Sequence, residues 1–202
     1  MLPFTSAVIL AAGKATRMGS QKLLLPLGEQ TIIEKVADAV LSSKVDEVII
    51  VLGYKSQGVA DALGKRILKF VVNKDYALGQ STSLVAGIKS VNPKAKAVVL
   101  VLGDQPMINS SLIDTLIDFH FTSGKLATRP VCKGKPGHPV IIDSSLIPDL
   151  LSLQGDTGAK EVIAHVDGGI ACMEVENHYL LQDVDTVGAY NEMIKALQAD
   201  KC

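Results

Sequence analysis

Residues 8–26 read VILAAGKATRMGSQKLLLP, and this stretch decides how the fold is interpreted. The apolar run over residues 7–10 is typical of a buried strand. It ends in three small residues that let a ligand lie close to the backbone, Ala11, Ala12 and Gly13. The loop that follows carries two cations, Arg17 and Lys22. Free backbone N–H groups beside two cations suit a polyphosphate, because each phosphate oxygen favours a charge-assisted donor.

Two familiar phosphate loops are excluded by the same stretch. The dinucleotide fingerprint G-x-G-x-x-G is absent, because Lys14 and Ala15 follow Gly13. The Walker pattern also fails, because Gly19 is followed by Ser-Gln-Lys and not by Lys and then Ser or Thr. An ordinary surface loop between a strand and a helix stays open as the alternative at this point.

Composition excludes several classes of function. The 202 residues are 48% hydrophobic and 20% charged, which is typical of a globular domain with a substantial core. The formal net charge of −1 gives no basic field for nucleic acid. Three cysteines without C-x-x-C spacing predict a reducing compartment, Cys132, Cys172 and Cys202. No apolar run approaches a signal peptide or a membrane span, so we expect a cytoplasmic protein.

Apolar strands alternate with amphipathic helices along the chain. Strands are predicted over residues 45–52, 67–72, 97–102, 126–131, 139–142, 170–176 and 180–184, and helices over residues 32–41, 56–63, 83–90, 112–121, 144–153, 158–165 and 186–198. Thr31 and Glu34 predict a capping box for the first helix. The pattern predicts a single-domain, Rossmann-like, three-layer α/β/α fold with a mostly parallel mixed sheet. Leu10 and Leu102 then bring their loops to one sheet edge, where such folds bind ligands.

Asp104 is the first candidate for metal chemistry. It follows the strand over residues 97–102 in the sequence GDQP, so its carboxylate should lie at the edge of the sheet. Magnesium takes oxygen ligands and needs only one or two carboxylates when phosphate and water supply the rest. The alternative is that Asp104 caps the helix that begins near Ser110, but a capping residue should lie nearer to that helix.

Several motifs together resemble a known family. The pattern LAAGxxxRMGxxK over residues 10–22 resembles the opening of nucleotidyltransferases that activate sugar phosphates and cofactor precursors. Residues 22–28, KLLLPLG, are similar to the molybdenum cofactor cytidylyltransferases. Four later segments follow in that family's order: GQSTSL from Gly79, GHP from Gly137, GDTGAK from Gly155 and DVDT from Asp183. The resemblance implies the nucleotide-diphospho-sugar transferase fold over residues 1–202, with a nucleotide-binding half at about 6–106 and an acceptor-binding half at about 107–202.

The resemblance also implies roles for individual residues. Asp104 and Asp185 would hold Mg²⁺, with Mn²⁺ as an alternative, while Arg17, Lys22 and Asp104 would carry catalysis. Nucleotide binding is implied for Leu10, Ala11, Ala12, Gly13, Arg17, Lys22, Gln80, Ser83 and Gly103, and acceptor binding for His138, Asp156, Gly158 and Lys160. Plain structural roles stay open for three of these residues: a helix N-terminal charge for Asp185, a helix cap for Ser83 and a solvent-facing ring for His138.

Three positions depart from the family pattern: Ala15 replaces the common Ser, Lys160 replaces the usual Arg, and Val187 replaces a proline. Lys160 keeps the charge but loses bidentate geometry. The resemblance implies transfer of CMP from CTP to the terminal phosphate of molybdenum cofactor, with a receiving molybdoenzyme as a further partner and neither nucleic acid nor membrane involved. The alternatives are the same fold with GTP or another phosphate acceptor, of the guanylyl or sugar-phosphate type, and a non-catalytic cofactor-binding relative.

Overall fold

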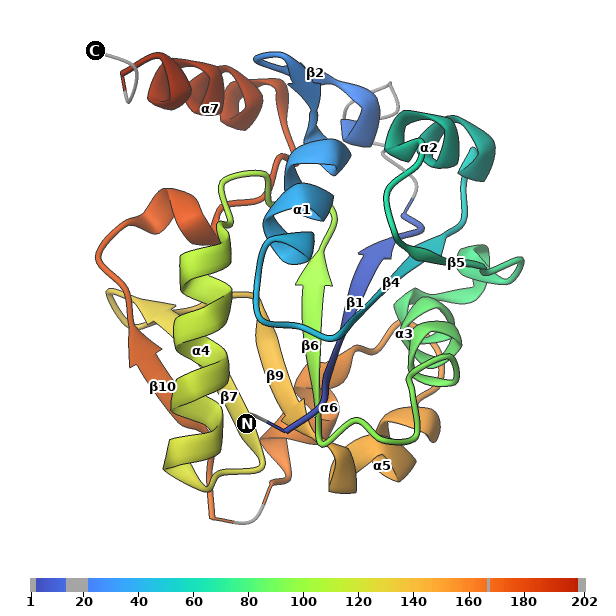
Figure 1. Cartoon of the computed structure of the whole chain (residues 1–202), viewed down its shortest axis with the longest axis vertical. Coiled ribbons are helices and arrows are strands. Elements are labelled where there is room, and N and C mark those ends of the chain that lie inside the picture. The colour runs from blue at the N-terminus through green and yellow to red at the C-terminus, as the bar shows by residue number, and fades with distance from the viewer. Residues whose placement is uncertain (1–2, 14–21, 167, 200–202) are drawn as a thin grey trace.

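A mixed sheet forms the centre of the protein, seen in a computed structural model that describes residues 3–13, 22–166 and 168–199 (Figure 1). Its strands are β1 (Thr5–Ala11), β4 (Glu47–Leu52), β5 (Lys69–Val72), β6 (Ala97–Leu102), β7 (Ala127–Cys132), β8 (Lys135–Pro136), β9 (Val140–Asp143) and β10 (Ala171–Glu174). The strand order is β10-β7-β9-β6-β1-β4-β5, and β8 pairs with β7. β9 runs antiparallel to both β6 and β7, whereas β6, β1, β4 and β5 are parallel.

Helices cover both faces of this sheet, which confirms the predicted three-layer fold (Figure 1). They are α1 (Ile32–Leu41), α2 (Ser56–Leu63), α3 (Gln80–Ile88), α4 (Ser110–Ser123), α5 (Ile147–Leu151), α6 (Ala159–Ala164) and α7 (Val187–Ala199). Buried residues of α1, α2, α4 and α7 share one hydrophobic cluster, and those of α3, α5 and α6 share the cluster on the other face. Within the parallel core, β1, β4 and β6 carry continuous apolar runs over residues 7–11, 48–52 and 97–102.

Most predicted elements are found, and two need correction. α1 has the predicted bounds, and Thr31 Oγ1 accepts from the N–H of Glu34 while the Glu34 carboxylate accepts from the N–H of Thr31. α3 begins at Gln80 and not at Ser83, because the chain turns into the helix directly after Gly79. The strand predicted over residues 180–184 is wrong: η4 (His178–Leu181) is a 3₁₀ turn, and the chain continues without strand pairing.

Short elements around the ligand edge were not predicted. They are η1 (Lys22–Leu24), the hairpin of β2 (Pro26–Leu27) and β3 (Gln30–Thr31), and η2 (Tyr76–Leu78). Each spans only two or three residues, too short for a periodic pattern to indicate it. The helix predicted over residues 144–153 is divided into η3 (Ser144–Leu146) and α5. η1 and η2 flank the carboxyl end of β1, so they form two walls of the ligand-binding edge.

The register of the parallel strands fixes the predicted ligand edge. Leu10 of β1 pairs with Leu102 of β6, and the N–H of Gly103 donates to Leu10 O at 3.0 Å. The loops after the two strands therefore start side by side, as the sequence predicts. The packing around Gly103 is tight, because a Cβ there would lie 3.0 Å from Leu10 O.

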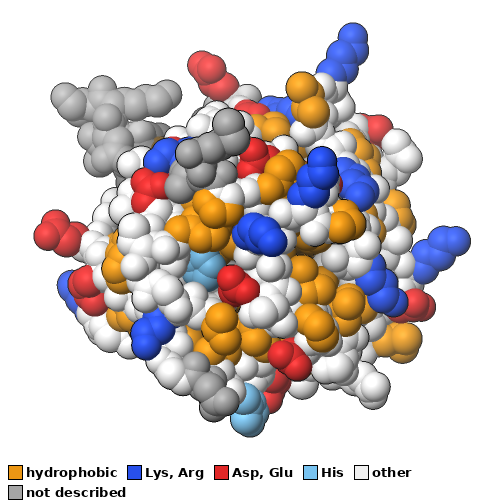
Figure 2. Space-filling model, turned by 60° about the horizontal axis from the view of Figure 1, so that its bottom comes forward, with side chains coloured by type: hydrophobic (Ala, Val, Ile, Leu, Met, Phe, Trp, Pro, Cys, Tyr) orange, Lys and Arg blue, Asp and Glu red, His pale blue; other side chains and the backbone are white. Residues whose placement is uncertain are grey.

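The surface agrees with the balanced composition. On the face seen in Figure 2, Lys and Arg are interspersed with Asp and Glu, and no large area carries charges of one sign. None of the helices within the described ranges has the length and apolar character needed to cross a membrane.

Candidate active site

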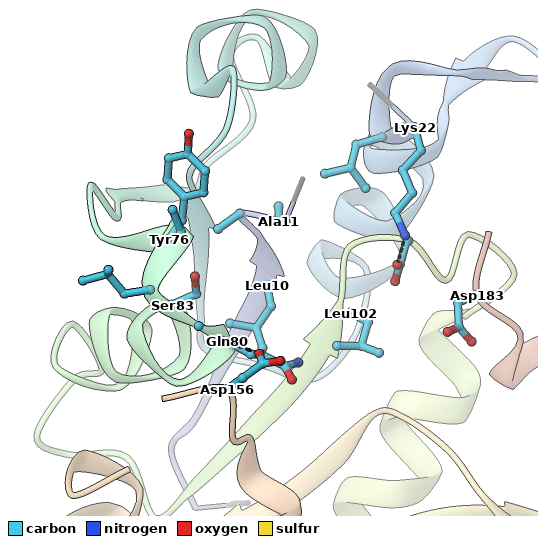
Figure 3. Close-up of a pocket in the computed structure, with 16 residues that line it drawn as sticks. Leu10, Ala11, Lys22, Tyr76, Gln80, Ser83, Leu102, Asp156 and Asp183 are labelled. Carbon is cyan, nitrogen blue, oxygen red and sulfur yellow. Dashed lines mark hydrogen bonds and ion pairs between the residues drawn. The ribbon is translucent and has the colours of Figure 1, made fainter. Parts of the chain in front are cut away.

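A cleft of about 760 Å³ opens at the carboxyl ends of β1 and β6. One wall is formed by η2 and the start of α3, and the opposite wall by η1 and the segments around residues 104 and 183 (Figure 3). The cleft is lined by Leu10, Ala11, Ala12, Gly13, Lys22, Leu23, Tyr76, Ala77, Leu78, Gly79, Gln80, Ser83, Leu102, Asp104, Asp156 and Asp183. The structure thus brings most predicted nucleotide-binding residues to one cleft; Arg17 lies outside the described residues.

Lys22 joins the two predicted metal-binding carboxylates. Its ammonium Nζ lies 2.5 Å from Asp104 Oδ2 and 2.6 Å from Asp185 Oδ1. The backbone holds this arrangement, because the N–H of Val184 donates to Asp104 O at 2.9 Å and so places Asp185 beside Asp104. Burial would lower the pKa of Lys22, but the two carboxylates outweigh it and raise the pKa above its ordinary value. The ammonium is therefore charged at neutral pH.

The donor set fits a divalent cation. Two carboxylates that share one ammonium lie on either side of a position that a small cation can fill. Among the residues that the structure describes, no group of three or more His, Cys, Asp or Glu gathers around one point. Two carboxylates are enough for Mg²⁺ only when substrate phosphates and water complete its coordination. The geometry therefore suits a metal that arrives with a phosphorylated ligand.

The alternative role of Asp104 as a helix cap is wrong, whereas Asp185 lies two residues before α7, where a negative charge is also favourable. Asn109 is the N-cap of α4, and its side chain accepts from the N–H of Leu112 at 2.8 Å, so Asp104 does not cap that helix. At α7, Thr186 Oγ1 accepts from the N–H of Ala189 at 3.1 Å. Asp185 instead points its carboxylate to Lys22.

The start of α3 carries the polar wall of the cleft. Ser83 lies inside the helix, so its predicted role as a cap is wrong; its Oγ accepts from Asn73 Nδ2 at 2.9 Å. Gln80 is the first helical residue, and its N–H donates to Asp156 Oδ1 at 3.2 Å. Asp156 therefore caps α3 as well as lining the cleft. Gln80, Ser83 and Asp156 are seen on this wall in Figure 3.

The GDTGAK segment holds the two halves of the chain together. Gly155 O accepts from Ser81 Oγ at 2.6 Å, and a Cβ on Gly79 would lie only 2.2 Å from the same oxygen. Gly79 also has a φ of +128°, which favours glycine. Both the close approach and the backbone conformation therefore require glycine at this position. The segment predicted to bind the acceptor is thus fixed directly to the nucleotide side.

The other predicted acceptor residues differ in their surroundings. His138 is half-buried and not solvent-facing, and burial lowers its pKa, with the charge of Asp104 opposing and that of Arg129 adding to the shift. Gly158 is the N-cap of α6 and lies close to the Gln80 side chain. Lys160 is exposed and does not line the cleft. The structure brings His138 toward Asp104 and leaves Lys160 outside.

Sequence reasoning missed several lining residues. Tyr76 and Leu78 form the apolar part of one wall, and 70% of Leu78 is exposed. Asp183 lines the opposite wall, in the same DVDT segment as Asp185. Its place in that motif could have pointed to it, whereas nothing in the local pattern distinguishes Tyr76 and Leu78 from loop residues.

Comparison with known proteins agrees with this site. Residues 7–170 match the family model described as "MobA-like NTP transferase domain", and the chain belongs to this family. The resemblance to molybdenum cofactor nucleotidyltransferases is thereby confirmed at the level of the family, and the activity class is nucleotidyl transfer.

Relatives cover nearly the whole chain. "Nicotine blue oxidoreductase" of Paenarthrobacter nicotinovorans is 30% identical, over 92% of this chain and 94% of its own length. The crystal structure of an Rv0371c homologue from Mycobacterium sp. strain JC1 has a TM-score of 0.86 at 30% identity, covering 96% of this chain and 97% of that one. Rv0371C of Mycobacterium tuberculosis H37Rv, solved in complex with manganese, has a TM-score of 0.83 at 25% identity, covering 96% and 100%.

Proposed function

We propose that this protein transfers CMP from CTP to the terminal phosphate of molybdenum cofactor and releases pyrophosphate. The observation that carries the proposal is the Lys22 ammonium shared by Asp104 and Asp185 at the edge of the cleft. A cation position bounded by two carboxylates, next to backbone N–H groups at the end of β1, suits a metal-bound triphosphate. The manganese complex of the mycobacterial relative supports a divalent metal in this family.

Each residue then has a defined task. Asp104 and Asp185 hold Mg²⁺, which when bound supplies positive charge at the α-phosphate. Lys22 exchanges its two carboxylates for the β- and γ-phosphates, so its ammonium has anionic partners before and after the nucleotide binds. Arg17 also binds these phosphates. Residues 10–13 keep the backbone close to the nucleotide, and Gln80 and Ser83 contact its sugar and base.

The reaction needs no covalent enzyme intermediate. A phosphate oxygen of the acceptor forms a bond to the α-phosphorus, and the bond from the α-phosphorus to the bridging oxygen of pyrophosphate breaks. A phosphate monoester is already a nucleophile at neutral pH, so no general base is required. The contribution of the protein is to hold both substrates in line and to balance the charge of the leaving group.

Pyrophosphate release tests this proposal directly. The protein is incubated with Mg²⁺ and CTP, GTP or ATP, each with and without molybdenum cofactor. Release that requires both CTP and the cofactor supports the proposal. Release with GTP, or with CTP and a different phosphate acceptor such as a sugar phosphate, overturns the substrate assignment. Cofactor binding without pyrophosphate release from any nucleotide identifies a binding protein instead of an enzyme.

A further inference from the structure

Arg129 of β7 carries a charge that no carboxylate of the described residues pairs with. Among the described residues, no ion pair or hydrogen bond engages its guanidinium, and its Nε is buried without a partner. The side chain as a whole is half-buried. A buried N–H that has given up water without gaining a protein acceptor is unfavourable, so such a group calls for an explanation. A ligand that supplies the missing acceptor is one.

Strand geometry places Arg129 on the face of the sheet that α3, α5 and α6 cover. Thr128 points to the opposite face, where its Oγ1 lies 2.9 Å from His120 Nδ1 of α4. Successive side chains alternate, so Arg129 points away from α4 and toward the side covered by α3, α5 and α6. Ala127, two residues earlier, packs in the cluster on that side.

The register brings Arg129 near the ligand edge and beside His138. β7 pairs Thr128 with Ile141 of β9 and Val131 with Pro136 of β8, so Arg129 lies on the stretch of β7 that faces residues 137–140. β6 pairs Leu100 with Val140, and His138, two residues before Val140, therefore lies nearer the carboxyl end of β6. The N–H of Gly137 donates to Pro130 O at 2.9 Å and holds this segment against β7.

Electrostatic coupling agrees with this placement. The charges of Asp104 and Arg129 both act on the pKa of the His138 ring, in opposite directions, so the ring is near both groups. His138 itself makes no hydrogen bond to another residue of the described ranges. Burial keeps the ring neutral near pH 7, where it can donate one N–H and accept at the other nitrogen.

We propose that Arg129 and His138 form the site that binds the phosphate group of the acceptor. The inference rests on the proposed function, because that function requires an organic phosphate monoester beside the α-phosphate. The guanidinium can donate to two phosphate oxygens at once, and the imidazole N–H supplies a third hydrogen bond to the phosphate. Two oxygens held on this side leave another free to face the nucleotide over Asp104. Lys160, the cation that the motif suggests for this role, is exposed. Arg129 and His138 lie beyond the residues that line the cleft, so the proposed phosphate site adjoins the cleft.

The alternative is a purely structural arginine. Long arginine side chains can cover apolar surface with their methylene groups while the charge stays in water. In that case the guanidinium would not affect anion binding at His138. A structural role and a ligand-binding role therefore differ in what happens at the His138 ring when phosphate is added.

NMR of the His138 imidazole separates the two roles without any nucleotide chemistry. Inorganic phosphate is titrated into the wild-type protein and into Arg129→Gln, Arg129→Lys and Lys135→Gln. Lys135→Gln is the matched control, because it removes the same charge from the exposed β8 strand next to β7. We expect phosphate to shift the ring signals and raise the pKa of His138 in the wild type and in Lys135→Gln. The affinity should fall at least about tenfold in Arg129→Gln and less in Arg129→Lys, which keeps the charge.

Equal phosphate affinity at His138 in the wild type and Arg129→Gln, or no shift at all in the wild type, overturns the inference. Pyrophosphate release then tells this failure from a failure of the proposed function. If the wild type turns over CTP and Arg129→Gln keeps the acceptor KM, the function stands and the phosphate site is wrong. If phosphate binding depends on Arg129 but no nucleotide is turned over, the site stands and the transfer reaction is wrong.

Discussion

The proposed nucleotide site and the proposed phosphate site of the acceptor differ in how their cationic side chains are paired. On the nucleotide side, the ammonium of Lys22 is fully engaged by Asp104 and Asp185. On the acceptor side, the guanidinium of Arg129 has no counter-ion among the described residues, and the neighbouring His138 ring is neutral. On the first side the two carboxylates outnumber the one ammonium, which favours a divalent cation, and Lys22 must exchange partners when the nucleotide binds. The second side needs an anion. A metal-bound nucleotide suits the first side, and a free phosphate ester suits the second.

The largest effect on turnover should come from removing a carboxylate beside Lys22. Asp104→Asn removes one carboxylate from the shared cation position, and we expect turnover to fall by roughly 10²–10³-fold, the usual loss for one electrostatic contact at the reacting group. Steady-state pyrophosphate release measures it. Asp118→Asn is the control, because it removes the same charge from an exposed pair with Lys44. Full turnover in Asp104→Asn would remove Asp104 from the metal site.

The contact that joins the two sides can be tested through stability. Gly79→Ala places a Cβ 2.2 Å from Gly155 O at a φ of +128°. Strain together with the enforced backbone shift should lower the free energy of unfolding by about 2–5 kcal/mol. Gly155→Ala is the matched control: its φ of +68° is also unfavourable, but nothing lies within 4 Å of the new Cβ. We expect a loss of only about 1–2 kcal/mol there by urea denaturation; equal losses would mean that the close approach is not rigid.

A smaller change should sharpen the assignment of the nucleotide wall. Ser83→Ala removes one of the two hydroxyls that Asn73 Nδ2 contacts, and Thr82 Oγ1 remains. The free energy of unfolding should fall by about 0.5–1.5 kcal/mol. The KM for CTP should rise while the acceptor KM is unchanged. Ser90→Ala, just after the same helix, should change neither KM. A rise in the acceptor KM alone would assign Ser83 to the acceptor site and not to the nucleotide site.

The smallest effect concerns the buried histidine behind β7. Burial lowers the pKa of His120 below its ordinary value of about 6.5, with the charge of Asp143 opposing. The unfolded chain then binds the proton more readily, so stability is complete above pH 6.5 and falls as the pH drops below it. His120→Gln should lose less stability between neutral and acid pH than the wild type in parallel thermal scans. Identical acid losses would exclude His120 as a contributor.

The sequence predicts the regular parts of this fold well, because there local signals agree with tertiary packing. Thr31 and Glu34 specify the start of α1, and the continuous apolar run of β6 indicates a strand buried on both faces. The strand expected at residues 180–184 fails because its apolar residues pack against the core from an unpaired segment; Val184 is buried without belonging to a strand. Period alone cannot distinguish these two cases.

The site shows the same division. The aspartates at the ends of apolar segments could be found, since position after a strand and the family motif point to them. Arg129 could not, because a single arginine inside a strand has the same local pattern whether it is paired or free. Only the register of β7 with β9 reveals that it lies beside His138. Lys22 likewise binds two carboxylates that lie 82 and 163 positions further along the chain, and no local sequence pattern reports contacts over such separations.

Binding of Mn²⁺ in the presence of CTP, followed by electron paramagnetic resonance, tests the central claim most directly. The account predicts that the wild-type protein and Asp118→Asn bind Mn²⁺ tightly with CTP and weakly without it, because the nucleotide must complete the coordination and take Lys22 from Asp104 and Asp185. Asp104→Asn and Asp185→Asn should each lose this CTP-dependent binding. Undiminished Mn²⁺ binding in both variants would contradict the account, because the metal would then lie elsewhere.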